Sequence, residues 1–376
     1  MTVRSIGEID ITTTTFMVVF VVGALALVVA VGALLRTRLG RIGRPGKALV
    51  VALSTVLLLV GAGAGVNAHF DYFRTLGDVL GMPPSDEVEL AVLLARKHRP
   101  SRGVVTTLTL PGRTSGFPTR PATVYVPPVW FARPRPQLPV VMLLHGTPGT
   151  PQDWLGGGQA AATADAYAAT HDGWAPIIVM PDVNGTVNAD SECVDSPAGR
   201  VETYLSQDVP RFIREVFHAA PPGRSWAVAG LSEGGSCSLM LALRHPDLFP
   251  TFGDYAGLAG PRAGETNADT ASTVADLFAG SPAALAAHEP AAILAGRRFP
   301  QLGGWFEVGD ADPEPLAAAT TLVPAARRAG VRTCDVVVPG GVHTFALFSQ
   351  AFADSLPWMA GRVGAGPPVH DPRCAP

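Results

Sequence analysis

The sequence is nearly without lysine and carries no strong charge of either sign. Lys47 and Lys97 are its only lysines, the formal net charge is −3, and no long run of one sign follows residue 50. Nucleic-acid binding requires a basic face, so that class of protein is excluded. The H-E-x-x-H and C-x-x-C motifs of zinc and redox sites are absent, and no internal repeat is evident.

Cysteines are few, and all of them lie in the second half of the chain: Cys193, Cys237, Cys334 and Cys374. Four cysteines allow three connectivities, and free buried thiols are the alternative to pairing. We favour disulfides Cys193–Cys237 and Cys334–Cys374, because the first would tie a long loop to a helix and the second would attach a Pro-rich tail to a late strand. Pairing in turn predicts an oxidising compartment.

Charge is also missing from two stretches near the N-terminus. Phe16 to Leu35 and Ala48 to Val66 contain no charged residue. Each is long enough to cross about 30 Å of hydrocarbon. The sequence therefore predicts a two-helix transmembrane hairpin over residues 1–66. A cleaved signal peptide is the alternative for the first stretch, but it lacks a strongly basic start and a second span follows it.

The loop between the two apolar stretches is basic, whereas the segment before them is not. Positive charge in short loops remains in the cytoplasm, so this loop is expected inside, with the N-terminus and everything after Val66 outside. The chain is thus predicted to be a multi-pass protein of the cell membrane with an extracytoplasmic C-terminal part. The basic loop residues are Arg36, Arg38, Arg41, Arg44 and Lys47.

After the anchor, residues 67–103 are expected to form a stalk or linker, with an amphipathic stretch from Asp86 to Lys97. Residues 363–376 form a Pro-rich tail. Between them, over residues 104–362, short β-rich runs alternate with helical patterns, which predicts an α/β domain with a mostly parallel sheet flanked by helices. The expected strands are 104–110, 122–126, 139–144, 176–180, 226–229, 251–256, 305–308 and 333–338. The expected helices are 160–170, 202–217, 233–244, 314–329 and 345–360.

One pentapeptide in this domain has the pattern G-x-S-x-G: residues 230–234, with Ser232 at the centre. The apolar run Trp226 to Ala229 leads into it, and a helical pattern leads out of it. This strand-turn-helix exposes the serine oxygen at the sheet edge and is typical of the nucleophile of the α/β-hydrolase fold. We predict that fold, with Ser232 as the nucleophile.

A serine hydroxyl needs a base to take its proton and an acid to orient that base. In this fold the acid and then the histidine follow the serine along the chain. Among the later histidines, only His343 follows a predicted strand through a flexible turn and precedes the last helix. The others are His245 at the end of the nucleophile helix, His288 in an Ala-rich helix, and His370 in the tail.

Two carboxylates compete to be the acid. Asp310 and Asp312 both follow the predicted strand 305–308, in a loop expected at the same sheet edge as Ser232. Asp312 directly precedes Pro313, a position well suited to capping a helix. The residues alone leave this choice open.

The oxyanion of the acyl-transfer transition state must be received by backbone N–H groups. Glu233, directly after the nucleophile, supplies one. The loop after residues 143–146 supplies the other, at Thr147, since Pro148 has no N–H. His145 in that loop is interpreted as a structural residue.

No metal and no cofactor is expected. The oxygen-rich segment Asp182 to Asp190 has its glycine misplaced for an EF-hand loop and no paired helices around it. A calcium site is therefore not predicted.

Four motifs, in this order and spacing, resemble the esterase D group, or esterase family, of α/β-hydrolases, which includes feruloyl esterases and secreted mycolyltransferases. The resemblance covers roughly residues 104–362. It implies a lightly capped fold, a Ser232, Asp312, His343 triad with Asp312 preferred over Asp310, and an oxyanion hole from Thr147 and Glu233. Glu233 departs from the methionine that is commoner at that position. The motifs are residues 145–147 with 153–154, residues 230–235 with 245–249, residues 309–312, and residues 340–345.

The resulting hypothesis is a serine esterase that cleaves carboxylic esters outside the cytoplasmic membrane, in the envelope or the extracellular space, through an acyl-enzyme on Ser232. Its partners would be an ester or acyl-lipid substrate and, through the N-terminal helices, the membrane. An acyltransferase that moves the acyl chain to a sugar hydroxyl is the first alternative. A catalytically silent envelope-binding protein on the same scaffold is the second.

Overall fold

The structure is a computed structural model that describes residues 87–374 without a break. It divides into two compact units, Met1–Ser85 and Asp86–Pro376. Before residue 87 the described residues are 11, 22–23, 25–26, 28–29, 31–33, 48, 52, 55–56, 59–67, 72–73 and 75–79.

In the first unit, residues 59–67 are helical and α4 is a single turn, Leu76–Val79. No helix among the described residues combines the length and apolar character needed to cross a bilayer. Most of the stretch 16–35 and part of 48–66 lie outside the described residues, so the transmembrane hairpin stays a prediction.

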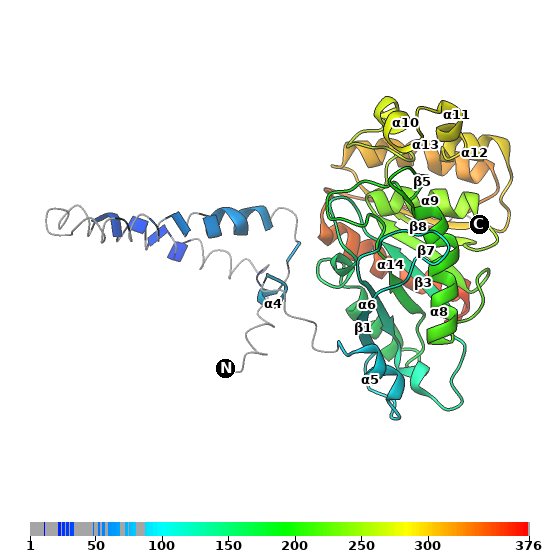
Figure 1. The fold of residues 1–376 in the computed structure, drawn as a ribbon, viewed down its shortest axis with the longest axis horizontal. Helices are drawn as coiled ribbons and strands as arrows, with labels where there is room; N and C mark the ends of the chain where they lie inside the picture. Colours follow the sequence, from blue (N-terminus) through cyan, green and yellow to red (C-terminus); the bar gives the residue numbers. More distant parts are fainter. Residues whose placement is uncertain are drawn as a thin grey trace. The chain divides into compact units, whose positions relative to one another are not determined.

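The second unit is built on an eight-stranded sheet with the order β1-β2-β4-β3-β7-β8-β9-β10 (Figure 1). Strand β2 runs antiparallel to β1 and β4, and every other pair is parallel. The central strands are buried along their whole length, as expected where helices cover both faces of a parallel sheet. The strands are β1 Val104–Leu108, β2 Ala122–Val126, β3 Val140–Leu144, β4 Ile177–Met180, β7 Trp226–Leu231, β8 Thr251–Tyr255, β9 Gly303–Gly309 and β10 Arg332–Val338; β5 Asp195–Ser196 and β6 Gly199–Arg200 form a separate hairpin.

The helices form two packed sets against this sheet. Helices α6 and α14 contact each other and strands β4, β7, β8 and β9, whereas α9, α12 and α13 form a connected set against β3 and β7 to β10. Their bounds are α5 Leu90–Ala95, α6 Ala160–Ala169, α7 Val201–Thr203, α8 Val209–Phe217, α9 Glu233–Arg244, α10 Thr270–Leu277, α11 Pro282–Ala286, α12 Pro290–Gly296, α13 Pro313–Arg328 and α14 Phe345–Val363; short 3₁₀ or π turns are η1 Pro128–Phe131, η2 Pro151–Trp154 and η3 Tyr204–Asp208. The mostly parallel sheet flanked by helices was predicted from the sequence and is confirmed.

Three features differ from the predicted organisation. The segment between β8 and β9 contains α10, α11 and α12, which the predicted series lacked, and His288 lies in the turn between α11 and α12 rather than in a helix. The predicted helix 202–217 is interrupted by the π turn η3. The second unit also begins at Asp86, inside the predicted stalk, because Val88 donates its N–H to the Val105 carbonyl and Leu93 is fully buried in the core.

The C-terminal tail is attached to the sheet. Helix α14 ends at Val363, and Cys374 lies beside Cys334 of β10, where the two residues form a β-bridge and a disulfide. The Arg373 guanidinium lies 4.6 Å from the centre of the Trp305 ring. The predicted stapling of a late strand by a Pro-rich tail is therefore present.

Candidate active site

The turn that carries Ser232 joins β7 to α9 and is fixed by close backbone packing. Ser232 has φ 54° and ψ −122°, a conformation that L-residues rarely adopt. The turn can form because positions 230 and 234 are both glycine, and neither position has room for a side chain. A Cβ on Gly230 would lie 2.2 Å from the Gly234 carbonyl oxygen, and a Cβ on Gly234 would lie 2.3 Å from that of Leu144. The glycine spacing therefore allows the strained turn that holds the hydroxyl at the sheet edge.

Three side chains distant in sequence meet at this edge. His343 Nε2 lies 2.9 Å from Ser232 Oγ, and His343 Nδ1 lies 2.6 Å from Asp312 Oδ2. The Asp312 side chain is 10% exposed and that of His343 is 40% exposed. An imidazole thus bridges an alcohol and a buried carboxylate, and the imidazole is partly exposed to solvent.

The structure distinguishes the two competing acids by their contacts. Asp312 stands at the N-cap position of α13 but makes no side-chain hydrogen bond to the helix, and its carboxylate faces His343 instead. Asp310 Oδ1 accepts the N–H of Gly340, 2.6 Å away, in the turn that leads to His343. Asp310 therefore supports the histidine loop and does not contact the imidazole.

Two unpaired backbone N–H groups lie on either side of the nucleophile. Glu233 is the first residue of α9, so its N–H has no partner within the helix, and the positive end of the helix dipole is there. Gly146 packs on Ser232, since an added Cβ would lie 3.0 Å from the Ser232 Cβ, and Thr147 follows it. In the part of the chain that the structure describes, neither the Thr147 nor the Glu233 N–H donates a hydrogen bond. Both are free to receive an oxyanion.

His145 is held as a structural residue, as predicted. Its Nδ1 lies 2.8 Å from the Gly146 carbonyl oxygen, and its Nε2 accepts the N–H of Val183 at 3.1 Å. Arg120 donates to Asp182 beside it through Nε, at 3.0 Å. Both ring nitrogens are occupied, so this histidine positions the loop before Thr147.

Two of the other candidate histidines, His245 and His288, contact Glu202. Buried Glu202 accepts from Arg244 at 2.7 Å, from His245 at 2.8 Å and from His288 at 3.2 Å. Burial alone would raise the pKa of Glu202, but these hydrogen bonds from His245, His288 and Arg244 hold it well below its usual value. The cluster ties the end of α9 to the segment between α11 and α12. His370 is exposed in the tail.

Both favoured disulfides, Cys193–Cys237 and Cys334–Cys374, are present. Cys237 lies one turn after Glu233 on α9, and the Glu233 carboxylate comes within 4.8 Å of the sulfur atoms of Cys193 and Cys237. These three residues are the one group within the described ranges close enough together to suggest a metal site. The two sulfurs are bonded to each other and offer no thiolate ligand.

Sequence reasoning missed the polar network around Glu233. Asn184 and Glu192 donate to the Glu233 carboxylate, and Asp190 lies close to it. Asn184 and Asp190 belong to the segment interpreted only as a rejected calcium loop, and Glu192 follows that segment. The one signal in the sequence was a carboxylate at a position where the fold buries the side chain, since a buried carboxylate requires hydrogen-bond donors. That signal does not say where in the chain the donors come from.

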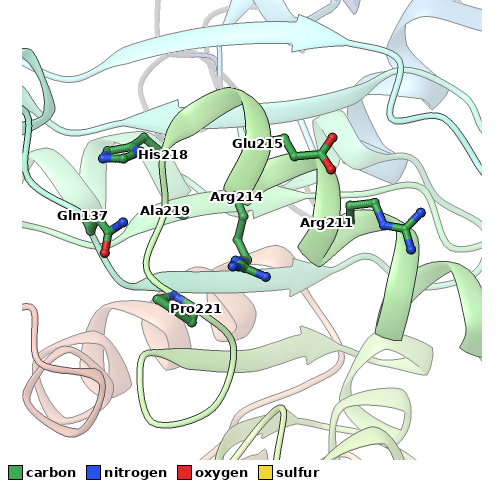
Figure 2. Close-up of a pocket in the computed structure, with 7 residues that line it drawn as sticks. All are labelled: Gln137, Arg211, Arg214, Glu215, His218, Ala219 and Pro221. Carbon is green, nitrogen blue, oxygen red and sulfur yellow. The ribbon is translucent and has the colours of Figure 1, made fainter.

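A surface pocket lies elsewhere, around the C-terminal half of α8 (Figure 2). It has a volume of about 300 Å³, and no residue of the Ser232 site lines it. Its lining residues are Gln137, Arg211, Arg214, Glu215, His218, Ala219 and Pro221.

Comparison with known proteins identifies proteins that are similar to this chain. An uncharacterised protein of Corynebacterium glutamicum, Cgl0967/cg1104, is 33% identical over 331 residues, which cover 84% of this chain and 76% of that protein. Among solved structures, a ferulic acid esterase aligns with a TM-score of 0.61 at 22% identity, covering 70% of this chain and 99% of the esterase.

Two further solved structures share the fold. An S-formylglutathione hydrolase from Agrobacterium tumefaciens aligns with a TM-score of 0.59 at 20% identity over 72% of this chain and 99% of the hydrolase. MPT51 (FbpC1) of Mycobacterium tuberculosis aligns with a TM-score of 0.53 at 18% identity over 68% of this chain and 97% of MPT51. Residues 118–359, more than half of the chain, match the family described as "Putative esterase". The chain belongs to this esterase family and shares the fold of the ferulic acid esterase and the S-formylglutathione hydrolase.

Proposed function

We propose that the chain is a serine esterase that cleaves carboxylic esters outside the cytoplasmic membrane through an acyl-enzyme on Ser232. The observation that carries the proposal is the hydrogen-bonded series from Ser232 through His343 to Asp312, next to the two unpaired N–H groups of Thr147 and Glu233. A structural serine in a turn has no need of either feature.

The geometry supports the following steps. Ser232 Oγ bonds to the ester carbonyl carbon as His343 Nε2 takes its proton, and the carbonyl electron pair moves to the oxygen between the two N–H groups. The oxyanion then re-forms the carbonyl, the C–O bond to the alcohol breaks, and the alcohol leaves with the proton from Nε2. A water molecule repeats the sequence on the acyl-enzyme. Asp312 orients the imidazole and stabilises the imidazolium throughout.

Hydrolysis is proposed ahead of acyl transfer because the site is open. The His343 side chain is 40% exposed, so water has access to the base that activates the second nucleophile. An acyltransferase must keep water away from the acyl-enzyme. Whether hydrolysis or acyl transfer predominates is tested by incubating the protein with an acyl ester, with and without a trehalose-like acceptor. The proposal predicts free acid as the main product in both, and a predominantly acylated sugar would favour the transferase.

The location outside the membrane belongs to the same proposal. Support comes from the two disulfides, which persist in oxidising compartments, and from the basic loop between the two predicted spans. The match to the C. glutamicum relative covers 84% of this chain, which is more than residues 86–376 make up. The similarity therefore extends into the N-terminal unit. A membrane-impermeant fluorophosphonate should label the protein in intact cells, and labelling only after lysis would contradict this location.

The enzymatic proposal itself is tested with purified protein. A fluorophosphonate should label the wild type and not Ser232→Ala, and p-nitrophenyl ester turnover should fall about 10⁴- to 10⁶-fold in that variant. A folded wild type that shows neither labelling nor turnover would favour the silent binding protein.

A further inference from the structure

The side chain that follows the nucleophile is a buried carboxylate. Glu233 is 6% exposed, although the chemistry of the oxyanion hole requires only its backbone N–H. Burying a carboxylate is costly unless donors surround it, so its contacts indicate what it contributes.

Every donor to the Glu233 carboxylate comes from the loops that border the site. Glu233 Oε2 accepts from the Thr147 hydroxyl and from Asn184 Nδ2, the latter at 2.7 Å. Glu233 Oε1 accepts the N–H of Glu192 at 3.1 Å. Asn184 Nδ2 also lies 2.6 Å from Thr147 Oγ1, and the same hydroxyl lies 3.0 Å from the Ala189 carbonyl oxygen. Two loops are thus held by one carboxylate.

Thr147 and Glu233 are the two residues whose backbone N–H groups would receive the oxyanion. They come from different elements, the loop after β3 and the start of α9, and 86 residues separate them. Their hydrogen bond is a direct side-chain link between the two halves of the oxyanion hole. We infer that the Glu233 carboxylate is a positioning residue, which sets the distance between the two N–H groups by holding Thr147. This inference rests on the proposed esterase function.

The contribution is one of hydrogen bonding rather than of negative charge. A charge so near the developing oxyanion would oppose it. Burial raises the pKa of Glu233, and burial together with Asp190 and Glu233 raises the pKa of Glu192 well above its usual range, so the surroundings disfavour added charge. A neutral side chain of the same length that still accepts from Thr147 should therefore serve.

This distinction gives a series of variants. Glu233→Gln keeps an acceptor oxygen for Thr147, and we expect kcat within about 3-fold of wild type. Glu233→Leu removes the acceptor, and kcat should fall about 10- to 100-fold with little change in KM, less than the loss from removing an oxyanion donor outright. Thr147→Val removes the hydroxyl but keeps the N–H, and it should give a loss similar to that of the leucine variant.

The double variant completes the cycle. If Glu233 acts through Thr147, the combination of Glu233→Leu and Thr147→Val should be no more than about 3-fold slower than the slower single variant, because both changes break the same link. Glu307→Leu is the matched control, since it also removes a carboxylate from a buried position, on β9. It should leave kcat within about 2-fold.

The possible results distinguish a failure of this inference from a failure of the proposed esterase function. Absence of esterase turnover in the wild type overturns both. With wild-type turnover established, the inference alone is overturned if Glu233→Leu retains wild-type kcat, if the glutamine variant loses as much as the leucine variant, or if the two single losses multiply in the double variant.

Discussion

Removing the disulfide beside the nucleophile helix should impair catalysis as well as stability. Cys193 follows Glu192, whose N–H donates to the Glu233 carboxylate, and Cys237 lies one turn along α9 from Glu233. The perturbation is the double replacement Cys193→Ala and Cys237→Ala, which releases the loop that holds Glu192.

The second disulfide provides a control with almost the same loop length. The paired cysteines are 44 residues apart in Cys193–Cys237 and 40 apart in Cys334–Cys374. Loop-closure entropy gives about 4 kcal/mol of stabilisation for either length. The losses of stability should therefore match, whereas only the first disulfide touches the network around Glu233.

The assay pairs urea unfolding with steady-state ester hydrolysis at a low temperature, where both variants remain folded. We expect free energies of unfolding that agree within about 1 kcal/mol, since disulfide contributions vary by that order. We expect kcat to fall about 10-fold in the Cys193 and Cys237 variant, as for a shifted oxyanion donor, and to stay within about 2-fold in the other. Equal kcat values in the two variants would refute the link between disulfide and oxyanion hole.

Further predictions concern the acid, the elbow and a buried carboxyl. Asp312→Asn should lower kcat about 10³- to 10⁴-fold and Asp310→Asn at most about 10-fold, measured by ester turnover; equal losses would contradict the assignment. Gly234→Ala should cost about 3 kcal/mol in urea unfolding, because its Cβ would meet a carbonyl oxygen at 2.3 Å. Burial raises the pKa of Glu307 from 4.5 to about 7, so wild-type stability should fall as the pH rises through that range. Between about pH 4 and 8, the free energy of unfolding should fall by about 3 kcal/mol less in Glu307→Gln than in the wild type. A difference between the two proteins that does not change with pH would contradict this assignment.

The sequence was sufficient for the sheet and for the turn that carries Ser232 because both depend on local patterns. The apolar run Trp226 to Ala229 leads directly into the G-x-S-x-G pattern, which indicates a buried strand. Glycine is needed on both sides of Ser232 because Gly230 packs against Gly234, and Gly234 packs against the Leu144 carbonyl. The position of His343 followed from chain order, which the fold imposes. These predictions needed no knowledge of side-chain contacts.

Where local patterns were ambiguous, contacts across the fold made the difference. Asp312 has the sequence position of a helix cap, and only the placement of His343 31 residues later explains why its carboxylate leaves the helix uncapped. The segment between β8 and β9 is rich in alanine, proline and glycine, so no periodicity marked its three short helices. The partners of Glu233 come from residues 147, 184 and 192, a set that no spacing rule predicts.

The sheet edge around Ser232 is held together by three separate devices. Backbone packing of glycines fixes the Ser232 turn, the Asp310 carboxylate fixes the turn before His343, and the Glu233 carboxylate fixes the loop of Thr147. The motifs at residues 230–234 and 309–312 mark the first two of these devices in the sequence, whereas the partners of Glu233 at Asn184 and Glu192 come from a segment that carries no motif.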